Sequence, residues 1–306
     1  MTLSVEKEAK GGNQPRSSMP LTIKDFKGKA EPDWCPGCGD FGVLVAIKQA
    51  LAELGIRPHQ AMVISGIGCS SNLPGYLSTY GMHTLHGRSL SVATGAQMAN
   101  HELKIIVTGG DGDGYGIGLN HFIQAMRRNI NLTYIVMNNE VYGLTTGQAS
   151  PTTTEGHKTK STPRGNVEKP IQPLALAIAT GATYVARGFS GEPKQLTKLI
   201  AGAITHKGFS LIDVFSPCVT FNKINTYPWF KERLYKLEDG PYDPTDLMAA
   251  MEKSMEWGSR IPIGLLYRHE KPTYEDTEPV LTKGPLVDQP LGIDPKTFAE
   301  ILAETM

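Results

Sequence analysis

The sequence predicts an α/β protein built on a doubly wound, mostly parallel sheet with helices on both faces. Short apolar runs that suit buried strands alternate almost one for one with stretches whose apolar residues keep helical spacing. This alternation is typical of parallel strands joined by crossover helices. With 306 residues, 40% of them hydrophobic, the chain suffices for one sizeable domain with loop-rich additions or for two modest domains.

The first half of the chain supplies three strands and three helices to this scheme. One helix is expected to begin near Asp40, whose carboxylate suits an N-cap, and to end before Gly55, a residue type common at helix C-termini. Two further helices are expected at 89–100 and 119–128. The strands are expected at 61–65, 104–108 and 132–137.

The second half begins with a long loop at 143–172 that is rich in Gly, Thr, Pro and Lys. A loop of this length within a compact domain is usually functional or mobile. After it we expect helices at 174–180 and 193–206, and strands at 183–186 and 210–215.

The periodic pattern fades beyond Cys218, where Pro, Tyr and charged residues become frequent. One helix is expected near 245–257, and the last helix begins at Asp294 with Pro295 in its first turn. We therefore expect three parts. They are a flexible tail at 1–25, a cofactor-binding domain at 26–225, and an arm at 226–306 that packs on a neighbouring subunit.

Composition excludes several function classes. Thirty Lys and Arg balance thirty Asp and Glu, so charge gives no reason to expect a nucleic acid or an anionic membrane as partner. The most apolar stretch, 41–54, is interrupted by Lys48 and Glu53 and does not suit a membrane span. The N-terminus has acids among its bases and lacks the apolar core of a signal peptide. We therefore expect a cytoplasmic protein.

The stretch from Gly109 to Gly147 organises the rest of the chain. It starts with glycine-flanked acids directly after one expected strand, and Asn138 and Asn139 directly follow the next strand. Strand ends joined by a crossover helix lie side by side in a parallel sheet, so the acid and the Asn pair can share one ligand. Carboxylate and amide oxygens suit Mg²⁺, and glycines let the backbone approach a phosphate closely. The stretch therefore predicts a cradle for Mg²⁺ and a diphosphate.

The dense glycines of this stretch also suggest the alternative of a nicotinamide dinucleotide site. Such a site needs an acidic residue at the end of the following strand, where it binds the ribose. That strand ends in Asn138 and Asn139 instead. The dinucleotide interpretation is therefore rejected.

The four cysteines lie in loops that are expected at the same end of the sheet as the cradle. Cys35 and Cys38 form a CPGC pair before the first helix, whereas Cys69 and Cys218 each follow an expected strand. Four thiolates gathered there suit a 4Fe–4S cluster or a structural Zn²⁺. The alternative is a CPGC turn accompanied by two buried core thiols.

Six motifs occur in order along the chain: WCPGCGDFG, GIGCSSNLPGY, HTLHGR, GGDGDGYGIG, NNEVYGLTTGQ and SPCVTFN. Together they resemble the β subunit of the 2-oxoacid:ferredoxin oxidoreductases, which binds thiamine diphosphate (ThDP). The resemblance covers residues 26 to 225 and is specific, because all six motifs agree in order. It implies the ThDP diphosphate-binding fold for this part of the chain.

The resemblance also implies how the cofactors are held. A Gly-Asp-Gly triplet followed one strand later by an Asn pair is similar to the ThDP fingerprint, and the spacing favours Asp111 as the acid that binds Mg²⁺. The family pattern adds the Asn139 side chain and the Val141 carbonyl as further ligands. It makes Cys35, Cys38, Cys69 and Cys218 the ligands of one 4Fe–4S cluster. The residues expected to bind ThDP are Ser70, Ser71, His86, Gly110, Asp111, Gly112, Asp113, Asn139, Val141, Gly143, Leu144 and Thr145.

The reaction implied by the resemblance is a reversible, CoA-dependent oxidative decarboxylation of a 2-oxoacid to an acyl-CoA and CO₂. Electrons would pass one at a time through the cluster to ferredoxin, and any second cluster would have to lie on another subunit. His86 and Arg88 could reach the diphosphate or the substrate, although His86 could instead cap the following helix. Asn72 could line the substrate pocket, and Leu144 could shape its side-chain end. The candidate catalytic residues are thus Cys69, Asn72, His86, Arg88 and Leu144.

One necessary group is missing from the expected fold. ThDP enzymes place a carboxylate, normally a Glu from a separate pyrimidine-binding domain, against the aminopyrimidine ring. Only one α/β unit is expected here. We therefore expect an α subunit to supply the pyrimidine-binding domain and its Glu, the chain alone to be inactive, and the assembly to be a dimer of αβ units.

The segment YGLTTGQASPTT is more similar to 2-oxoglutarate or broad-specificity members of the family than to pyruvate members. We therefore favour 2-oxoglutarate as substrate, with a pyruvate or broad-specificity enzyme as the nearest alternative. Two other hypotheses are a non-redox ThDP-dependent decarboxylase with a structural metal, and a non-catalytic assembly subunit that holds a metal and docks a partner.

Overall fold

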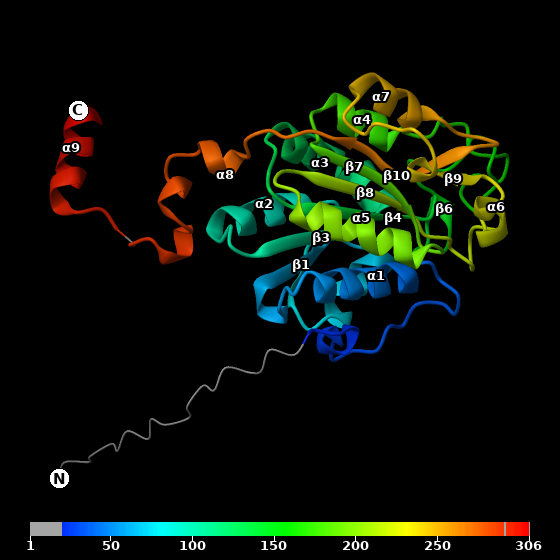
Figure 1. Ribbon diagram of the computed structural model, residues 1–306, viewed down its shortest axis with the longest axis horizontal. Helices are drawn as coiled ribbons and strands as arrows, with labels where there is room; N and C mark the ends of the chain where they lie inside the picture. Colours follow the sequence, from blue (N-terminus) through cyan, green and yellow to red (C-terminus); the bar gives the residue numbers. More distant parts are fainter. Residues whose placement is uncertain (1–19, 291, 306) are drawn as a thin grey trace, which may run out of the picture.

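The computed structural model describes residues 20–290 and 292–305, which form an eight-stranded sheet with helices on both faces (Figure 1). The strand order is β2-β1-β3-β4-β8-β7-β10-β9. Neighbouring strands are parallel except for β10, which is antiparallel to β7. The mostly parallel α/β fold predicted from the sequence is therefore confirmed.

The elements up to residue 215 lie close to their predicted positions. The strands of the sheet are β1 (Ala61–Ser65), β2 (Tyr80–His83), β3 (Lys104–Gly110), β4 (Thr133–Asn138), β7 (Tyr184–Phe189), β8 (Ser210–Phe215), β9 (Leu234–Lys236) and β10 (Ile261–Arg268). The short pair β5 (Val141–Tyr142) and β6 (Gln148–Ala149) lies outside the sheet. The helices are α1 (Asp40–Glu53), α2 (Ser89–Ala99), α3 (Leu119–Arg127), α4 (Pro173–Ala179), α5 (Pro193–Thr205), α6 (Tyr227–Lys231), α7 (Leu247–Met255), α8 (Tyr274–Thr277) and α9 (Pro295–Thr305).

Helix α1 shows how local sequence produces these elements. Its buried residues Val43, Leu44, Ile47 and Leu51 follow the three- to four-residue spacing of one helix face. Gly55 follows the helix with φ +66°, a left-handed conformation that glycine adopts without a steric penalty. Asp40 is the first helical residue and not the N-cap, which is Gly39. The Asp40 carboxylate instead accepts a hydrogen bond from Ser216 Oγ at 2.6 Å.

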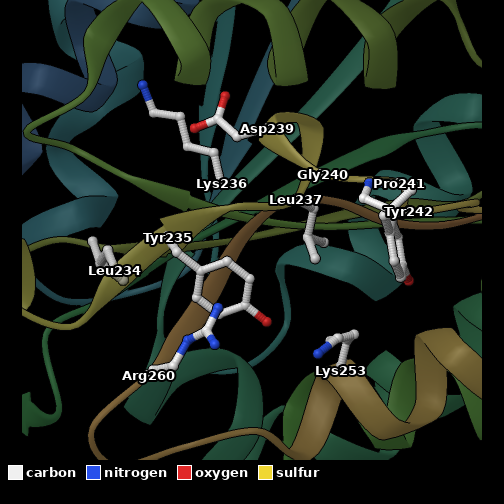
Figure 2. A pocket seen from close by; sticks show the side chains of 10 residues that line it. All are labelled: Leu234, Tyr235, Lys236, Leu237, Asp239, Gly240, Pro241, Tyr242, Lys253 and Arg260. Carbon is white, nitrogen blue, oxygen red and sulfur yellow. The ribbon is translucent and has the colours of Figure 1, made fainter.

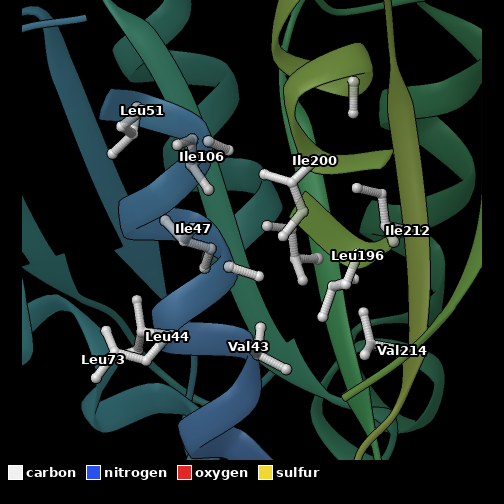
Figure 3. Packing of buried hydrophobic residues seen from close by; sticks show 14 of the residues in the cluster. Val43, Leu44, Ile47, Leu51, Leu73, Ile106, Leu196, Ile200, Ile212 and Val214 are labelled. Atoms are coloured by element: carbon white, nitrogen blue, oxygen red, sulfur yellow. The ribbon is translucent and has the colours of Figure 1, made fainter. Parts of the chain in front are cut away.

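The sheet separates two hydrophobic cores. On one face α1 and α5 pack together over the sheet, and Figure 3 shows Val43 and Ile47 of α1 on the same side of the sheet as Leu196 and Ile200 of α5. On the other face α2, α3, α4 and α7 cover the strands, with buried Phe122 and Leu174 in their core. Covering both faces leaves the ends of the strands as the accessible surface of the sheet, and ligands of such sheets bind at the carboxyl ends.

The region after residue 226 differs from the arm that the sequence predicts. Strand β10 pairs with β7, β9 pairs with β10, and α7 packs against α4, so residues 234–268 belong to the body of the fold. The apolar run at 261–267 hides its strand character because it contains Pro262, which cannot donate to a ladder, and Gly264 at φ +129°. β2 was missed for a related reason, since all four of its residues are exposed and give no alternating pattern.

The 3₁₀ turn Leu286–Asp288 still contacts α2, and the chain leaves the body of the protein beyond this turn. Figure 1 shows this segment, coloured orange to red, extending to one side and ending in α9. No described residue of α9 is buried. The predicted docking arm is therefore shorter than 226–306, and its docking role stays a prediction. The predicted tail at 1–25 lies outside the described residues up to position 19, and Phe26, just after it, is fully buried.

In the described part of the chain, no helix combines the length and the apolar character that crossing a bilayer requires.

Candidate active site

A cavity of about 220 Å³ lies at the carboxyl ends of β1, β3 and β4, where the sequence predicts the cradle. Its wall combines four segments that are separated in the sequence: 67–70, His86, 110–113 and 137–145. The predicted residues that line it are Cys69, Ser70, His86, Gly110, Asp111, Gly112, Asp113, Asn139, Val141, Gly143, Leu144 and Thr145. The fold therefore brings most of the predicted cofactor site together in one place.

Some predicted residues lie outside this wall, and some wall residues were not predicted. Ser71 is buried, and Arg88 directly precedes α2 without capping it through its side chain. Asn72 donates from Nδ2 to Asp33 Oδ1 at 3.4 Å. The wall residues that sequence reasoning missed are Ile67, Gly68, Met137 and Tyr142.

The glycines of the cradle are required by close packing against aromatic rings. A Cβ added to Gly112 would lie 2.1 Å from Cε1 of Tyr142, and one added to Gly114 would lie 2.0 Å from the hydroxyl of Tyr134. Both distances are far shorter than a carbon contact permits. The Tyr142 hydroxyl also donates to the carbonyl oxygen of Gly112 at 3.2 Å. The aromatic residues thus fix the π-helical turn Gly112–Ile117 that follows β3.

Asp111 is 1% exposed and is held from behind by the long loop. Its Oδ2 accepts hydrogen bonds from Ser150 Oγ and, at 2.6 Å, from Thr152 Oγ1. Burial raises the pKa of this carboxyl, because the charged form loses its hydration. Ser150 and Thr152 therefore anchor part of the loop at 143–172 beneath the cavity. Sequence reasoning recognised that loop as functional or mobile but did not identify these contacts.

The two asparagines after β4 point in different directions. Asn139 lines the cavity, and its Oδ1 accepts a hydrogen bond from the Val141 amide at 3.1 Å. Asn138 is buried, and its Nδ2 donates to the Asp213 carboxylate at 3.3 and 3.4 Å. Glu140 between Asn139 and Val141 has φ +59°, a conformation that turns the chain sharply enough for both neighbours to face the cavity.

Buried carboxyls exceed buried cations around the cradle. The buried acids are Asp40, Asp111, Asp113, Glu140 and Asp213, whereas Arg187 is the one Lys or Arg buried within the described residues. Burial raises the pKa of Asp40 and of Asp213 to about 6, and burial together with repulsion from Asp111 raises the pKa of Glu140 to about 8. A divalent cation at Asp111 would relieve this excess negative charge. The donor set therefore fits Mg²⁺ with a diphosphate.

The loops that carry the cysteines converge beside the cavity. The Cys38 amide donates to the Cys35 carbonyl at 2.9 Å, and Trp34 Nε1 donates to the Cys69 carbonyl at 2.7 Å. The Gly39 amide donates to Pro217 O at 3.1 Å and so joins the CPGC turn to the loop of Cys218. Backbone and indole hydrogen bonds therefore connect all three cysteine-bearing loops.

Gly143 lies at the junction between these loops and the cradle. A Cβ added to Gly143 would lie 3.6 Å from Cys69 Sγ, 3.7 Å from Cys218 Sγ and 3.5 Å from Asn139 Nδ2. Two predicted cluster sulfurs and a predicted cradle ligand thus surround one glycine. Such closeness suits electron transfer between a cofactor in the cavity and a cluster beside it.

The four cysteines carry free thiols that are not paired in disulfides. Burial raises the pKa of Cys69 to about 11 and that of Cys38 still further. Among the described residues, no three His, Cys, Asp or Glu side chains are arranged closely enough to coordinate one metal ion. Each cysteine of a 4Fe–4S cluster binds a different iron, so the four thiols match such a cluster in kind and number without surrounding a single ion.

A larger hollow of about 610 Å³ contains none of the predicted site residues. It lies beside β9 and α7, where the ring of Tyr235 stacks under the Arg260 guanidinium at 4.4 Å (Figure 2). Its lysines are already paired, Lys236 with Glu192 at 3.0 Å and Lys253 with Glu256 at 2.8 Å. The larger of the two cavities is therefore not the one that holds the predicted site residues.

Two protein families match the chain. Residues 61–214 match the thiamine pyrophosphate enzymes in their C-terminal, TPP-binding domain, and residues 218–283 match the C-terminal region of the pyruvate ferredoxin oxidoreductase beta chain. The first match contains the cradle, Cys69 and the long loop. The second contains Cys218 and, in the region that sequence reasoning assigned to an arm, β9 and β10.

Known proteins are similar to the chain over most of its length. The β subunit of 2-oxoacid:ferredoxin oxidoreductase 1 of Aeropyrum pernix is 46% identical over 284 residues, which cover 89% of each chain. The 2-oxoglutarate synthase subunit KorB of Archaeoglobus fulgidus is 43% identical over 73% of this chain and 85% of its own. A solved structure of 2-oxoglutarate:ferredoxin oxidoreductase from Magnetococcus marinus, with 2-oxoglutarate, coenzyme A and succinyl-CoA bound, superposes with a TM-score of 0.86 at 42% identity, covering 92% of this chain and 96% of that one.

Proposed function

The chain belongs to the β subunits of the 2-oxoacid:ferredoxin oxidoreductases, and we propose that it forms the diphosphate-binding and redox half of a 2-oxoglutarate-oxidising site. The reaction is the CoA-dependent oxidative decarboxylation of 2-oxoglutarate to succinyl-CoA and CO₂. One observation carries the proposal: Gly143 borders the sulfurs of Cys69 and Cys218 on one side and Asn139 of the cradle on the other. A two-electron oxidation followed by one-electron transfer needs such proximity.

Asp111, the Asn139 side chain and the Val141 carbonyl would hold Mg²⁺, which in turn would hold the diphosphate of ThDP. When bound, ThDP supplies a nucleophilic carbon and accepts the electrons left by decarboxylation. The chain's own residues provide the rest: Gly110 and Gly112 admit the diphosphate, and the buried wall excludes water. Substituting Mn²⁺ for Mg²⁺ in the complex provides a direct test, because its electron paramagnetic resonance spectrum should change when ThDP is added. An unchanged spectrum would contradict the assignment.

Cys35, Cys38, Cys69 and Cys218 would ligate one 4Fe–4S cluster. Their number and their convergence beside Gly143 support this assignment over a structural Zn²⁺. Anaerobically purified complex should carry iron and sulfide at this subunit and show broad visible absorbance that bleaches on reduction. A colourless, zinc-containing subunit would favour the non-redox decarboxylase instead. An assembly role without catalysis would be indicated if ThDP and Mg²⁺ failed to raise the thermal stability of the complex.

The choice of 2-oxoglutarate rests on what the relatives act on and on the open end of the cavity. One similar solved structure holds 2-oxoglutarate, and a relative is named a 2-oxoglutarate synthase. Other relatives are named only as 2-oxoacid enzymes, so pyruvate or broad specificity is the alternative. Leu144 lines the cavity and is exposed, which places it to contact the substrate side chain. A competition assay between 2-oxoglutarate and pyruvate tests this choice of substrate. A higher kcat/KM for pyruvate would overturn it.

The cavity requires a second subunit to complete it. Its 220 Å³ lies below the roughly 300–1,000 Å³ of typical small-molecule sites. Exposed apolar side chains surround its mouth: Ile67 and Leu144 line it, Leu85 precedes His86, and Ile117 packs against Gly87. We propose that the pyrimidine-binding domain of the α subunit lies over this rim and contributes the activating Glu. Purified β chain supplied with ThDP, Mg²⁺ and CoA should then be inactive, and turnover by it would refute the proposal.

The remaining partners follow from the same assignment. Ferredoxin would accept the electrons, the reaction would occur in the cytoplasm, and two αβ units would associate into a dimer. The segment beyond Asp288, which leaves the body and exposes Phe298 and Ile301 of α9, is the candidate docking arm. Deleting residues 289–306 should lower the mass of the assembly in solution without unfolding the sheet. An unchanged mass would remove the docking role.

A further inference from the structure

Asp113 joins three parts of the cavity through one oxygen atom. The side chain is 2% exposed, and its Oδ1 accepts hydrogen bonds from the Gly87 amide at 2.7 Å and the Ile67 amide at 3.0 Å. His86 Nδ1 lies 2.7 Å from the same oxygen. The other oxygen, Oδ2, has no hydrogen-bond partner and is enclosed by the backbone, since a Cβ on Gly66 would lie 1.9 Å from it. Asp113 therefore cannot rotate without losing all three contacts.

This contact fixes the orientation of the His86 ring. Because Asp113 Oδ1 already accepts hydrogens from two backbone amides, it acts as an acceptor towards His86 as well, and Nδ1 of His86 is assigned the hydrogen. The opposite edge of the imidazole, which contains Nε2, then faces away from the buried acid. His86 is 39% exposed and lines the cavity. Its Nε2 is therefore available to whatever enters there.

The side chains of the cavity wall offer little other positive charge. Among the described residues that line it, His86 is the one side chain that can become a cation, whereas Asp111 and Asp113 are acids. Both molecules that the proposed function places in the cavity are anionic, namely a diphosphate and a 2-oxoacid. With Nδ1 held by Asp113, Nε2 is the ring nitrogen that an anionic oxygen in the cavity would meet, and it donates a hydrogen to that oxygen when the imidazole is protonated.

We propose that Asp113 is a positioning residue that holds His86 with Nε2 towards the cavity, where His86 binds an anionic oxygen of the diphosphate or of the substrate carboxylate. This inference rests on the proposed function. It assigns to Asp113 a structural link to His86 in place of direct contact with the cofactor. It also explains why the acid is placed two residues after Asp111, because the turn that exposes Asp111 to the cavity buries Asp113 against the loops at 66–67 and 86–87.

The test uses the assembled αβ complex carrying Asp113→Asn, His86→Gln or both substitutions. The dissociation constant of ThDP is measured at fixed Mg²⁺ without turnover, and KM is measured for 2-oxoglutarate and for a monocarboxylic 2-oxoacid. Loss of a charge-assisted hydrogen bond should weaken the affected quantity about 10- to 100-fold in each single variant. The double variant should be no more than about threefold weaker than His86→Gln, because Asp113 acts through His86. A changed ThDP constant identifies the diphosphate, and a changed KM alone identifies the substrate carboxylate.

Asp246→Asn is the matched control. Asp246 also accepts from two backbone amides, those of Met248 and Ala249, but it caps α7 away from the cavity. It should leave both quantities within about twofold. The inference is overturned if Asp113→Asn retains its full effect in the His86→Gln background, or if His86→Gln changes neither quantity. If Asp113→Asn fails to assemble, His86→Asn replaces it, since its short amide can still reach Asp113 but not the cavity; unchanged binding in that variant overturns the inference. A wild-type complex that binds no ThDP would instead refute the proposed function.

Discussion

The cradle and the cysteine loops lie on opposite sides of Gly143 and are built in different ways. The cradle acids are buried and tied to their surroundings, as the 2.6 Å hydrogen bond from Thr152 to Asp111 illustrates. The cysteines are less buried and range from exposed Cys35 to partly exposed Cys38, Cys69 and Cys218. The cradle is therefore organised before its ligand binds, whereas the more exposed cysteine loops should gain further order from the cluster that they bind.

If the cradle and the cysteine site are independent, Cys69→Ser should produce the largest difference between cluster content and ThDP affinity. Serine is a poor iron ligand, so the cluster absorbance and the bound iron should be lost completely. ThDP affinity at saturating Mg²⁺ should stay within about threefold of wild type, because Asp111 and Asn139 do not depend on the sulfur for their position. Absorbance spectra, iron analysis and calorimetry on the αβ complex measure both. A parallel loss of ThDP binding would show that the cradle is not organised in advance.

Asp111→Asn tests the opposite direction with a smaller effect. Removing the charge that binds Mg²⁺ should weaken Mg²⁺-dependent ThDP binding about 100-fold, in line with loss of a charged hydrogen-bonding or metal-ligating group. The hydrogen bonds from Ser150 and Thr152 can still reach the remaining carbonyl oxygen, so the fold should be retained. Cluster content, measured as iron per complex, should not change. Loss of iron in this variant would mean that the cysteine site depends on a filled cradle.

A third difference between the regions should appear in their response to pH. Burial raises the pKa of Asp213 to about 6, and burial with repulsion from Asp111 raises that of Glu140 to about 8, above ordinary values near 4. The folded state therefore binds more protons than the unfolded state between about pH 4 and pH 8, and stability decreases as pH rises through this window. The Cys69 thiol, with its pKa raised by burial to about 11, stays protonated throughout when no iron is bound.

The apparent Tm of the complex depleted of ThDP, Mg²⁺ and iron should accordingly fall by roughly 2–6 °C between pH 6 and pH 8. With ThDP and Mg²⁺ restored the decrease should be less than half as large, because the cation stabilises the ionised acids. Asp213→Asn should flatten the profile of the depleted complex, since its isosteric amide keeps Oδ1 for the hydroxyl of Tyr115. Differential scanning calorimetry provides the measurement. A Tm that rises with pH would contradict the sign of this argument.

The same contrast explains how much the sequence could predict. The cradle was predictable because Asp111 and Asn139 directly follow apolar strands, so their neighbourhood is set by sheet topology. Contacts from distant loops were not, and Ser150 and Thr152 gave no local signal that they bond to Asp111. Strands β2 and β10 were missed as well, because their residues do not alternate regularly between apolar and polar. The four cysteines were predictable as a set by residue type, whereas their arrangement depends on the loops.

Choosing between Asn138 and Asn139 illustrates the limit most directly. The two residues are chemically identical and adjacent, and the choice of Asn139 came from resemblance to a family pattern. The structure supplies a physical difference, because Asp213 lies on the neighbouring strand β8 and takes the Nδ2 group of Asn138. A contact with a residue 75 positions further along the chain cannot be deduced from the local pattern. Sequence therefore predicts which strand end carries the site, and packing decides which side chain faces it.

Gly143→Ala should have the smallest effect and tests the boundary itself. The added methyl group would lie 3.5–3.7 Å from Asn139 Nδ2 and from the sulfurs of Cys69 and Cys218, an ordinary contact distance that leaves no room for closer approach. Because the exposed cysteine loops are held less firmly than the buried cradle, the methyl group should slow cluster reduction several-fold while ThDP affinity falls less than about threefold. Gly75→Ala, at an exposed position where a Cβ meets nothing within 4 Å, is the control. Stopped-flow reduction of the cluster by 2-oxoglutarate and CoA measures the rate. Equal losses in both quantities would show that the two regions respond as one unit, and the difference drawn between them would then be wrong.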